Sequence, residues 1–172
     1  MPFTPYHFGP SGLVGLLFKR RLDLPVFLLA NVAVDLEVLL IAGLDLGYPT
    51  HRYAHTLLFG AVVGGAWGLA AYPLRPLFAR LMHLLRLPYE SGLRKMVISG
   101  VLGVWLHVLI DATYHPDVHL LWPSHAWPLW RIAYRHITRD QVKDLCVTLL
   151  IVAAALYVVL LAVQQRRTRR TP

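Results

Sequence analysis

The stretch LPVFLLANVAVDLEVLLIAGL, residues 24–44, is long and apolar enough to cross the hydrocarbon core of a membrane as a helix. Two carboxylates, Asp35 and Glu37, interrupt it near its middle. A charged residue at the centre of a lipid-embedded helix costs about 2.5–3.5 kcal/mol on insertion scales, so such residues normally face partners inside the protein. The stretch therefore predicts a membrane helix with a buried polar site beside it.

The composition of the whole chain is also that of a membrane protein. Of its 172 residues, 56% are hydrophobic and only 15% are charged, whereas soluble domains are about 45–50% apolar and about 25% charged. Three further apolar segments approach the length of a crossing, at residues 54–72, 96–113 and 144–163. We predict an all-α, polytopic membrane helical bundle with about four transmembrane helices, forming a single domain over residues 1–172.

Shorter segments complete the predicted bundle. Residues 11–18 are apolar and predict an N-terminal half-helix before the first crossing. The stretch LRPLFARLMHLLRL, residues 74–87, mixes apolar residues with Arg at helical spacing, which is typical of an interfacial helix. Residues 114–143 are polar, aromatic and contain proline, and they predict an extramembrane cap.

The net charge of +8 comes from basic clusters that flank the apolar segments. With residues 19–21, the loop 73–95 and the tail on one side of the membrane, that side holds twelve Lys and Arg and the other side five. Because these residues are enriched in cytoplasmic loops, we expect a cytoplasmic C-terminal tail and an outward-facing cap in the cytoplasmic (inner) membrane. Basic residues placed in this way indicate topology, so we expect no nucleic-acid partner.

Ionisable residues from several segments fall at similar depths in the predicted bundle. With a helical rise of ~1.5 Å per residue, Asp35 lies ~16 Å and Glu37 ~20 Å above the start of their helix at the cytoplasmic side. The same reasoning places four more residues at ~16–25 Å, namely His7, His55, His107 and Asp111. The sequence therefore predicts one polar layer in the outer half of the membrane.

The residue types in this layer suit a metal ion. His51 and His55, like His107 and Asp111, are four residues apart, so each pair is expected to share a helix face. Imidazole and carboxylate ligands without thiolate favour Zn²⁺, with Mn²⁺ or Fe²⁺ as alternatives. The candidate ligands are His7, Asp35, Glu37, His51, His55, His107 and Asp111.

Seven candidates exceed what one tetrahedral ion needs. Either two ions share a bridging carboxylate, or one ion takes four ligands and the remaining residues act as general base or outer partners. His115 and His119 continue the series into the cap. Pro116 is expected to break the helical spacing there, so we leave both histidines outside the ligand set.

Hydrolysis is the reaction that such a site favours. A metal ion would activate water and polarise the scissile group, and Asp35 or Glu37 would accept the proton. Arg52 is suited to bind an anionic substrate group, because guanidinium pairs bidentately with phosphate or carboxylate. A site in the outer half of the membrane favours an ester or phosphoester in a membrane lipid or a lipid-linked substrate.

Two other functions are open at this point. A divalent-metal transporter or another ion-pathway membrane protein would use the same polar layer as a transit site. It would require a second polar layer toward the cytoplasm, and these segments show none over the first ~15 Å. A membrane adaptor without catalytic activity would give no reason for clustered ligands.

The pattern resembles the YdjM-like family of membrane-bound, predicted metal-dependent hydrolases. The resemblance covers residues 1 to about 123 and rests on an early histidine after MPFTPYH, an acidic pair on the first long helix, an HR…H segment, HxxxD and LWP. It implies a hydrolase, distantly similar to zinc-dependent phospholipase C. It also implies metal or catalytic roles for His7, Asp35, His55, His107 and Asp111.

The sequence departs from the family pattern at two places. Val34 stands where the family has a proline before its acidic pair, and that pair is Asp35-Leu36-Glu37 where the family more often has Asp-x-Asp. The segment HRYAHT has its histidines four residues apart, whereas the family form has them five apart. Glu37 and His51 are therefore the candidates that the resemblance supports least.

Overall fold

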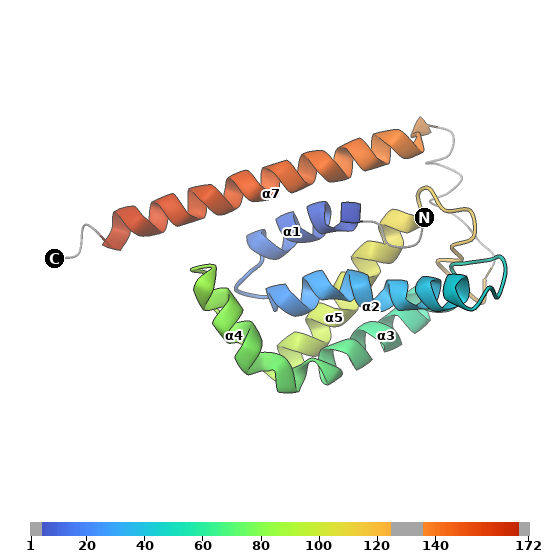
Figure 1. The fold of residues 1–172 in the computed structure, drawn as a ribbon, viewed down its shortest axis with the longest axis horizontal. Helices are drawn as coiled ribbons and strands as arrows, with labels where there is room; N and C mark the ends of the chain where they lie inside the picture. The colour runs from blue at the N-terminus through green and yellow to red at the C-terminus, as the bar shows by residue number, and fades with distance from the viewer. Residues whose placement is uncertain (1–4, 125–135, 169–172) are drawn as a thin grey trace.

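A computed structural model describes residues 5–124 and 136–168, and in these residues it contains helices and no strand (Figure 1). The helices in chain order are η1 (Pro5–His7), α1 (Phe8–Leu17), α2 (Leu24–Gly43), α3 (Leu57–Ala70), η2 (Tyr72–Leu74), α4 (Arg75–Leu84), α5 (Leu93–Asp111) and α7 (Arg139–Thr168). The prediction of an all-α fold is confirmed for this part of the chain.

Three of these helices, α2, α5 and α7, are long and apolar enough to cross a membrane. The pair of Leu57–Ala70 and Tyr72–Leu84, bent by 42°, is a fourth candidate if the two parts form one span. Pro73 is the second residue of the second part, and it has no N–H group with which to continue the hydrogen bonding of α3. The predicted crossings at residues 24–44, 96–113 and 144–163 coincide with α2, α5 and α7.

The third helix begins later than the segment 54–72 predicts. Residues 54–56 form a turn, and the Thr56 side chain accepts a hydrogen bond from the Phe59 N–H at 3.1 Å, which caps α3. His51 and His55 consequently lie in the loop before α3. The expectation that these two histidines share a helix face is wrong, because α3 begins only after its N-cap Thr56, and both histidines precede it.

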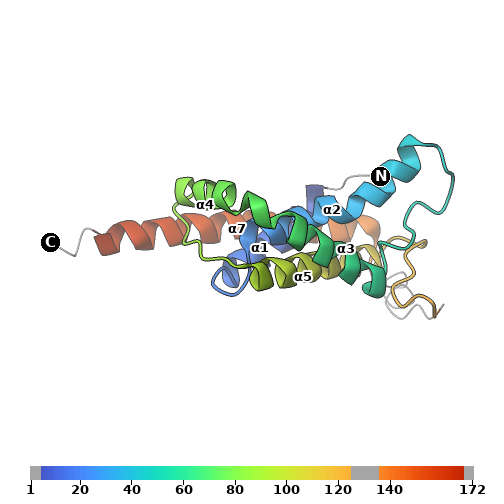
Figure 2. The same cartoon turned by 90° about the horizontal axis from the view of Figure 1, so that it is seen from below.

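Helix α5 lies at the centre of the bundle. It packs against α2 on one side and α3 on another, while α1 lies between α2 and α7 (Figures 1 and 2). Apolar side chains join α2 to α5, among them the fully buried Val34, Val104 and Val108. The apolar residues of α2 and α5 therefore serve the packing between these two helices.

Glycines bring the backbones of neighbouring helices into contact. A Cβ atom at Gly64 of α3 would lie 2.5 Å from the carbonyl oxygen of Gly100 on α5. A Cβ atom at Gly103 would lie 2.5 Å from the Phe27 carbonyl oxygen on α2. Small residues at such contacts are typical of membrane helix pairs. Since His107 and Asp111 follow Gly103 at four-residue steps, this close packing points them toward α2.

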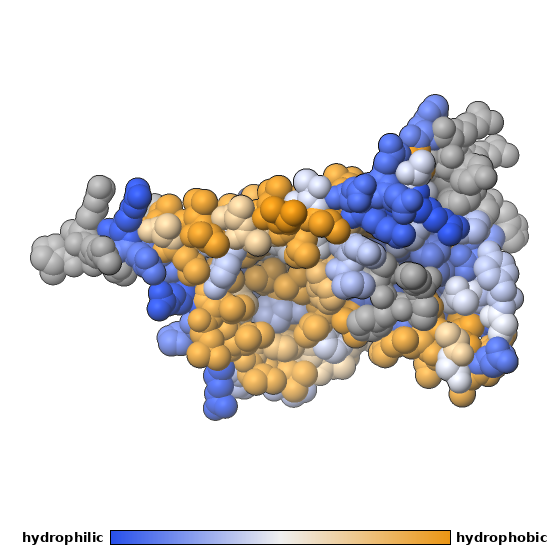
Figure 3. Space-filling view, turned by 45° about the horizontal axis from the view of Figure 1, so that its top comes forward, coloured by the Kyte–Doolittle hydropathy of each residue, from blue (hydrophilic) through white to orange (hydrophobic). Residues whose placement is uncertain are grey.

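One face of the molecule has the distribution of hydrophobic residues that a membrane protein would show. Figure 3 shows a largely hydrophobic middle with hydrophilic residues toward the two ends. Helix α7 is the most exposed of the candidate spans. An 18-residue stretch of it has a mean hydropathy of 2.9, and only 11% of that stretch is buried. Such a helix is stable in contact with lipid and unfavourable in contact with water.

The predicted cap is described only in part. Residues 114–124 form turns after α5, and the final residues of the predicted range 114–143 belong to the start of α7. Residues 125–135, which include His125, lie outside the described part of the chain.

Substituting Gly64 with Ala should destabilise the bundle. The new methyl group would meet the backbone of α5, and forced overpacking costs about 1–3 kcal/mol. The matched control is Gly65→Ala on the next residue, whose Cβ would meet only Val101 Cγ2 at 3.9 Å. Thermal unfolding of the detergent-purified variants should show a lower midpoint for Gly64→Ala alone, and equal midpoints would contradict the α3–α5 contact.

Candidate metal centre

Four buried side chains meet where α2, α5 and the loop before α3 come together. We call Asp35, His55, His107 and Asp111 the first group. Each offers one ligand atom, and all four atoms lie within 4.8 Å of one another. Residues that are distant in sequence thus form one cluster of two imidazoles and two carboxylates, which could hold a metal ion.

The distances within the first group suit a single small ion. Nε2 of His107 lies 3.2 Å from Asp35 Oδ1 and 3.0 Å from Asp111 Oδ2. Nε2 of His55 lies 3.6 Å and 3.7 Å from the same two oxygens. Tetrahedral ligands bound to zinc at about 2.0–2.2 Å are about 3.3–3.6 Å from one another. The four nitrogen–oxygen distances are thus close to those between ligands of one ion.

The Nε2 atoms of the first group lie within ion-pair distance of these oxygens but are not aligned with them as in a regular hydrogen bond. Nε2 of His55 and Nε2 of His107 are both buried without a hydrogen-bond partner. Buried polar atoms are rarely left in this state, and each exception requires a reason. Nitrogens that lie close to carboxylates but do not point at them are arranged as ligands around a common centre.

The other ring nitrogen of each histidine is hydrogen-bonded. Nδ1 of His55 lies 3.0 Å from Glu37 Oε2, and Nδ1 of His107 lies 3.3 Å from Asn31 Oδ1. A carboxylate only accepts, so Nδ1 of His55 donates and Nε2 keeps its lone pair. Histidines that bind metals are held in this way, with the second nitrogen on a carboxylate or carbonyl.

Asp111 is the residue that the most histidines approach. His7 lies with Nε2 3.0 Å from Asp111 Oδ1, and its ring stacks on that of His107 with centroids 4.0 Å apart. The Nε2 atoms of four imidazoles lie within 3.0–3.8 Å of this one carboxylate, from His7, His51, His55 and His107. The short N-terminal helices η1 and α1 therefore contribute to the cluster as well.

A second group lies next to the first and consists of His51, His115 and Asp117. Nδ1 of His51 lies 2.9 Å from Asp117 Oδ2, and this oxygen also accepts hydrogen bonds from the backbone N–H groups of Thr50 and His51 at 3.1 and 3.0 Å. Asp117 thereby connects the loop before α3 to the turns after α5.

His115 belongs to this second group, although the sequence placed it outside the ligand set. Its backbone N–H donates to the Asp111 carbonyl oxygen at 2.8 Å, so helical spacing continues one turn beyond α5. Pro116 lacks an N–H group of its own but does not prevent this bond, which forms before it. Asp117 was missed entirely, and the short run HPDVH, residues 115–119, was the available signal.

Glu37 and Arg52 belong to neither group of candidate ligands. The Glu37 carboxylate is on the Nδ1 side of His55 and also accepts hydrogen bonds from the N–H groups of Arg52 and Ala54, at 3.0 Å each. The Arg52 guanidinium donates to the carbonyl oxygens of Pro49 and Leu46, at 3.0 Å each. Catalytic roles for Asp35, Glu37 and Arg52 stay predictions, as does ligation by Glu37.

Two cavities adjoin this region. One of about 390 Å³ is lined by Pro49, His51, Arg52, Tyr53, Thr56, His119 and Trp122. The other, of about 460 Å³, is lined mainly by apolar residues of α2 and the loop before α3. Arg52 and Tyr53 line both cavities, so the two are neighbours.

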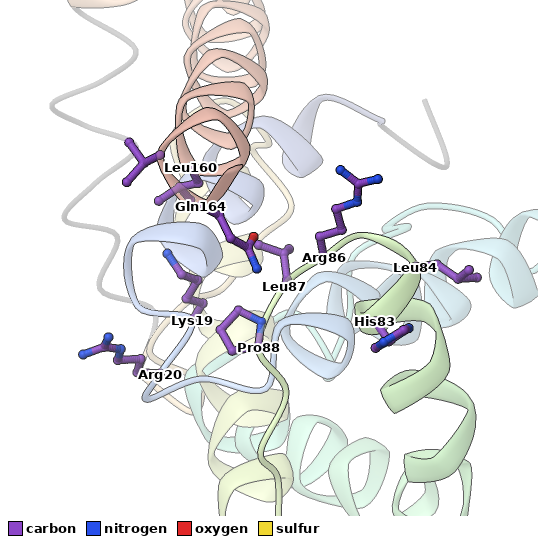
Figure 4. Close-up of a pocket in the computed structure, with 10 residues that line it drawn as sticks. Lys19, Arg20, His83, Leu84, Arg86, Leu87, Pro88, Leu160 and Gln164 are labelled. Atoms are coloured by element: carbon purple, nitrogen blue, oxygen red, sulfur yellow. The ribbon is translucent and has the colours of Figure 1, made fainter. Parts of the chain in front are cut away.

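A larger cavity of about 820 Å³ lies at the opposite end of α2 (Figure 4). Its lining includes Lys19 and Arg20 of the turn between α1 and α2, Arg86 after α4, and Leu160 of α7. Asp35 lies eleven residues from the start of α2, which corresponds to about 16 Å of helix. This basic cavity is therefore separate from the histidine and aspartate cluster.

Titration of the second group is shifted by its surroundings. Burial lowers the pKa of His115 to about 4, which keeps its imidazole neutral at pH 7. Burial tends to raise the pKa of Asp117, but the hydrogen bonds from the His51 side chain and backbone outweigh it and hold this pKa below its usual value. The second group thus combines a neutral imidazole with an ionised carboxylate, as metal binding requires.

Comparison with models of known protein families, with curated proteins and with solved structures found no match. Function is therefore argued from the site itself.

Replacing Asp117 with Asn should make the unfolding midpoint of the protein less sensitive to low pH. The folded pKa of Asp117 is depressed, so its stabilisation is present above the unfolded pKa of about 3.9 and is lost as the pH falls below it. With a chelator present, the unfolding midpoint of the wild type should fall more steeply between about pH 5 and pH 3 than that of the variant. The exposed Asp45→Asn is the control and should follow the wild type; identical curves for all three proteins would exclude this role.

Proposed function

We propose that this chain is a membrane-bound metal-dependent hydrolase that cleaves an ester or phosphoester in a lipid or lipid-linked substrate. The observation that carries the proposal is the first group, in which two buried imidazole nitrogens and two carboxylate oxygens converge to within 4.8 Å of one another. The resemblance of the sequence to the YdjM-like hydrolases supports the same conclusion.

Charge also favours a bound cation. Asp35 and Asp111 are 7% and 2% exposed, and no Lys or Arg forms an ion pair with either of them in the described residues. A buried carboxylate requires a counter-charge, because removing it from water costs several kcal/mol. A divalent cation between the two carboxylates supplies this charge, and nitrogen and oxygen ligands suit Zn²⁺, with Mn²⁺ or Fe²⁺ as alternatives.

The chemistry follows from the ion and its surroundings. Bound Zn²⁺ lowers the pKa of a coordinated water to about 7 and polarises the bond to be cleaved. Both Glu37 oxygens already accept hydrogen bonds from the protein, which makes Asp35 the better proton acceptor. Glu37 would instead orient His55 as a ligand.

The two neighbouring cavities fit an amphiphilic substrate. The cavity of about 390 Å³ combines His51 and Arg52 with aromatic residues and suits a polar or anionic headgroup. The cavity of about 460 Å³ lies against Leu36 and Leu40 and suits an apolar chain. Because Arg52 lines both, it lies where the two parts of one lipid would join.

The proposed setting is the cytoplasmic membrane, with the tail in the cytoplasm. The enrichment of Lys and Arg around residues 19–21, 73–95 and 166–170 supports this orientation. The cluster would then lie in the outer half of the membrane, where a lipid can enter sideways.

A metal transporter is the alternative function, and it needs a polar route from the cluster to the cytoplasmic side. Between Asp23 and Asp35, α2 buries the apolar Phe27 and Ala30 but also the polar Asn31. Asn31 donates a hydrogen bond to Ser11 at 3.1 Å, and the backbone N–H of Asp23 donates to Ser99 at 2.7 Å. These polar groups are used in contacts between helices, and on that ground we favour the hydrolase.

Metal binding should depend on Asp35. Protein purified in detergent should contain Zn²⁺ or a related ion, and a chelator should lower its unfolding midpoint in a manner that added Zn²⁺ reverses. Asp35→Asn should lose the ion and this response, because it removes a ligand charge from the first group. Asp45→Asn, which changes an exposed residue just after α2, should retain both. Purified protein without metal and without a response to Zn²⁺ would contradict the proposal.

Activity should require both the metal and a substrate of the proposed type. With Zn²⁺ bound, the protein should release product from long-chain carboxylic or phosphate esters faster than from short-chain ones, since the longer chain can fill the apolar cavity. Arg52→Gln should raise KM for anionic substrates by roughly tenfold or more, because a charge-assisted bond is lost. Metal-loaded protein that cleaves neither ester class would exclude this function.

A further inference from the structure

The cavity of about 820 Å³ lies at the end of α2 opposite the histidine and aspartate cluster (Figure 4). Three elements line it, namely the turn between α1 and α2, the end of α4 with the residues after it, and the C-terminal part of α7. Its volume is within the range of about 300–1,000 Å³ that is usual for small-molecule sites. The proposed function makes no use of this cavity.

The cavity is lined by cations that no carboxylate neutralises. Lys19, Arg20 and Arg86 line it, and within the described residues none of them takes part in an ion pair. Asp23 is the acidic residue nearest to Arg20 in sequence, but it is buried and accepts a hydrogen bond from the Tyr89 hydroxyl at 2.9 Å. Uncompensated positive charges around one cavity favour an anionic ligand.

Apolar side chains line another part of the same cavity. Leu87 follows α4, and Leu160 and Val163 belong to α7. Figure 4 shows Lys19 and Arg86 on opposite sides of Leu87. A free anion would have no use for the aliphatic surface, whereas an amphiphile with an anionic head uses both parts.

The cavity lies at the level where the apolar helices end. Helix α2 begins at Leu24, just after Lys19 and Arg20, and the candidate span in α7 ends at Arg166, close to Val163. Lipid headgroups lie at this level of a membrane. Basic pockets between membrane helices on the cytoplasmic side are typical binding sites for anionic lipid headgroups.

Arg86 occupies a backbone position that favours glycine. Its φ is +53°, in the left-handed region. Its N–H donates to the His83 carbonyl oxygen, and the Leu87 N–H donates to that of Met82, at 2.9 Å each. This is the Schellman arrangement at the end of a helix, in which the left-handed residue is usually glycine.

The strain at Arg86 indicates that its side chain has a function. A basic residue that only marked topology could stand at a neighbouring position without this strain. Residues other than glycine that are held in unfavourable backbone conformations are concentrated at functional sites. At Arg86 the strained position places a guanidinium at the cavity.

We propose that this cavity binds an anionic phospholipid, with its phosphate held by Lys19, Arg20 and Arg86 and an acyl chain lying against Leu160 and Val163. Arginine pairs bidentately with phosphate, and lysine binds it as a point charge. The lipid comes from the leaflet on this side of the membrane, which is the cytoplasmic one in the proposed orientation. It is distinct from the substrate of the proposed hydrolase, and the proposal requires no metal ion. By contacting all three elements, the lipid joins α7 and the end of α4 to the turn between α1 and α2.

Selective retention of lipid tests this proposal. Full-length protein in a non-ionic detergent is mixed with equal amounts of phosphatidylglycerol and phosphatidylcholine, and the lipids that stay bound are identified by native mass spectrometry. The wild type should retain phosphatidylglycerol over phosphatidylcholine by about tenfold or more, because the choline cation would lie among the cations of the cavity.

Arg86→Gly is the sharpest variant, because it removes the charge and the backbone strain together. It should lose most of the preference for phosphatidylglycerol, while its unfolding midpoint without lipid should equal or exceed that of the wild type. Lys19→Gln should also reduce the preference. Arg80→Gln, which changes an exposed residue of α4 outside the cavity lining, is the matched control and should keep it.

Three results would overturn the proposal. The first is equal retention of the two lipids by the wild type, and the second is an equal loss of preference in Arg80→Gln and Arg86→Gly. The third is loss of phosphatidylglycerol from Arg52→Gln but not from Arg86→Gly, which would place the lipid in the cavities beside Arg52.

Inorganic phosphate distinguishes a lipid from a free anion. Phosphatidylglycerol should raise the unfolding midpoint of the wild type, and the same concentration of inorganic phosphate should not. An equal rise with inorganic phosphate would assign the cavity to a free anion and contradict the binding of a lipid.

Discussion

The carboxylate of Asp111 is buried in an apolar helical bundle, where its charge has to be compensated, and we propose that a cation held by the surrounding histidines does so. Its two oxygens lie among the imidazoles of His7, His51, His55 and His107, at 3.0–3.8 Å. These histidines come from the N-terminus, the loop before α3 and α5. An uncompensated charge at this position would cost several kcal/mol, so the elements that carry the histidines must pack around α5. The same packing of elements around α5 therefore forms both the fold and the cluster.

Hydrogen-bonded partners outside the cluster give it its geometry. Glu37, Asp117 and Asn31 each accept from, or lie against, the Nδ1 atom of one histidine. Asn31 is itself held by Ser11 of α1 through Nδ2, at 3.1 Å. With the Nδ1 atoms occupied, the Nε2 atoms of His55 and His107 lie 3.0–3.7 Å from carboxylate oxygens of Asp35 and Asp111, which is close to the spacing of ligands around one ion. These partners fix the orientation of the imidazole rings, and for this reason the cluster is suited to metal binding.

Much of the fold could be predicted from the sequence because membrane helices have strong local signals. The apolar stretches that correspond to α2, α5 and α7 are long, and only a few residues change at their ends. The convergence of Asp35 and His107 also follows from helical rise, since both lie on regular helices. By contrast, His51 and His55 are in a capped loop, where helical spacing has no meaning. Their positions depend on hydrogen bonds to Glu37 and Asp117, which are distant in sequence.

The sequence by itself determined that this chain is helical, that it contains segments able to cross a membrane, and which histidines and carboxylates would share a depth. Periodicity and hydropathy are local properties, and they are sufficient for these conclusions. Only the tertiary structure decided the division of the polar residues into two groups, the position of Glu37 behind His55, and the inclusion of His115 and Asp117. Those features depend on side-chain direction and on contacts between loops. The positions of metal ligands must be right to within a few tenths of an ångström, whereas helical rise gives the depth of a residue only to within several ångström.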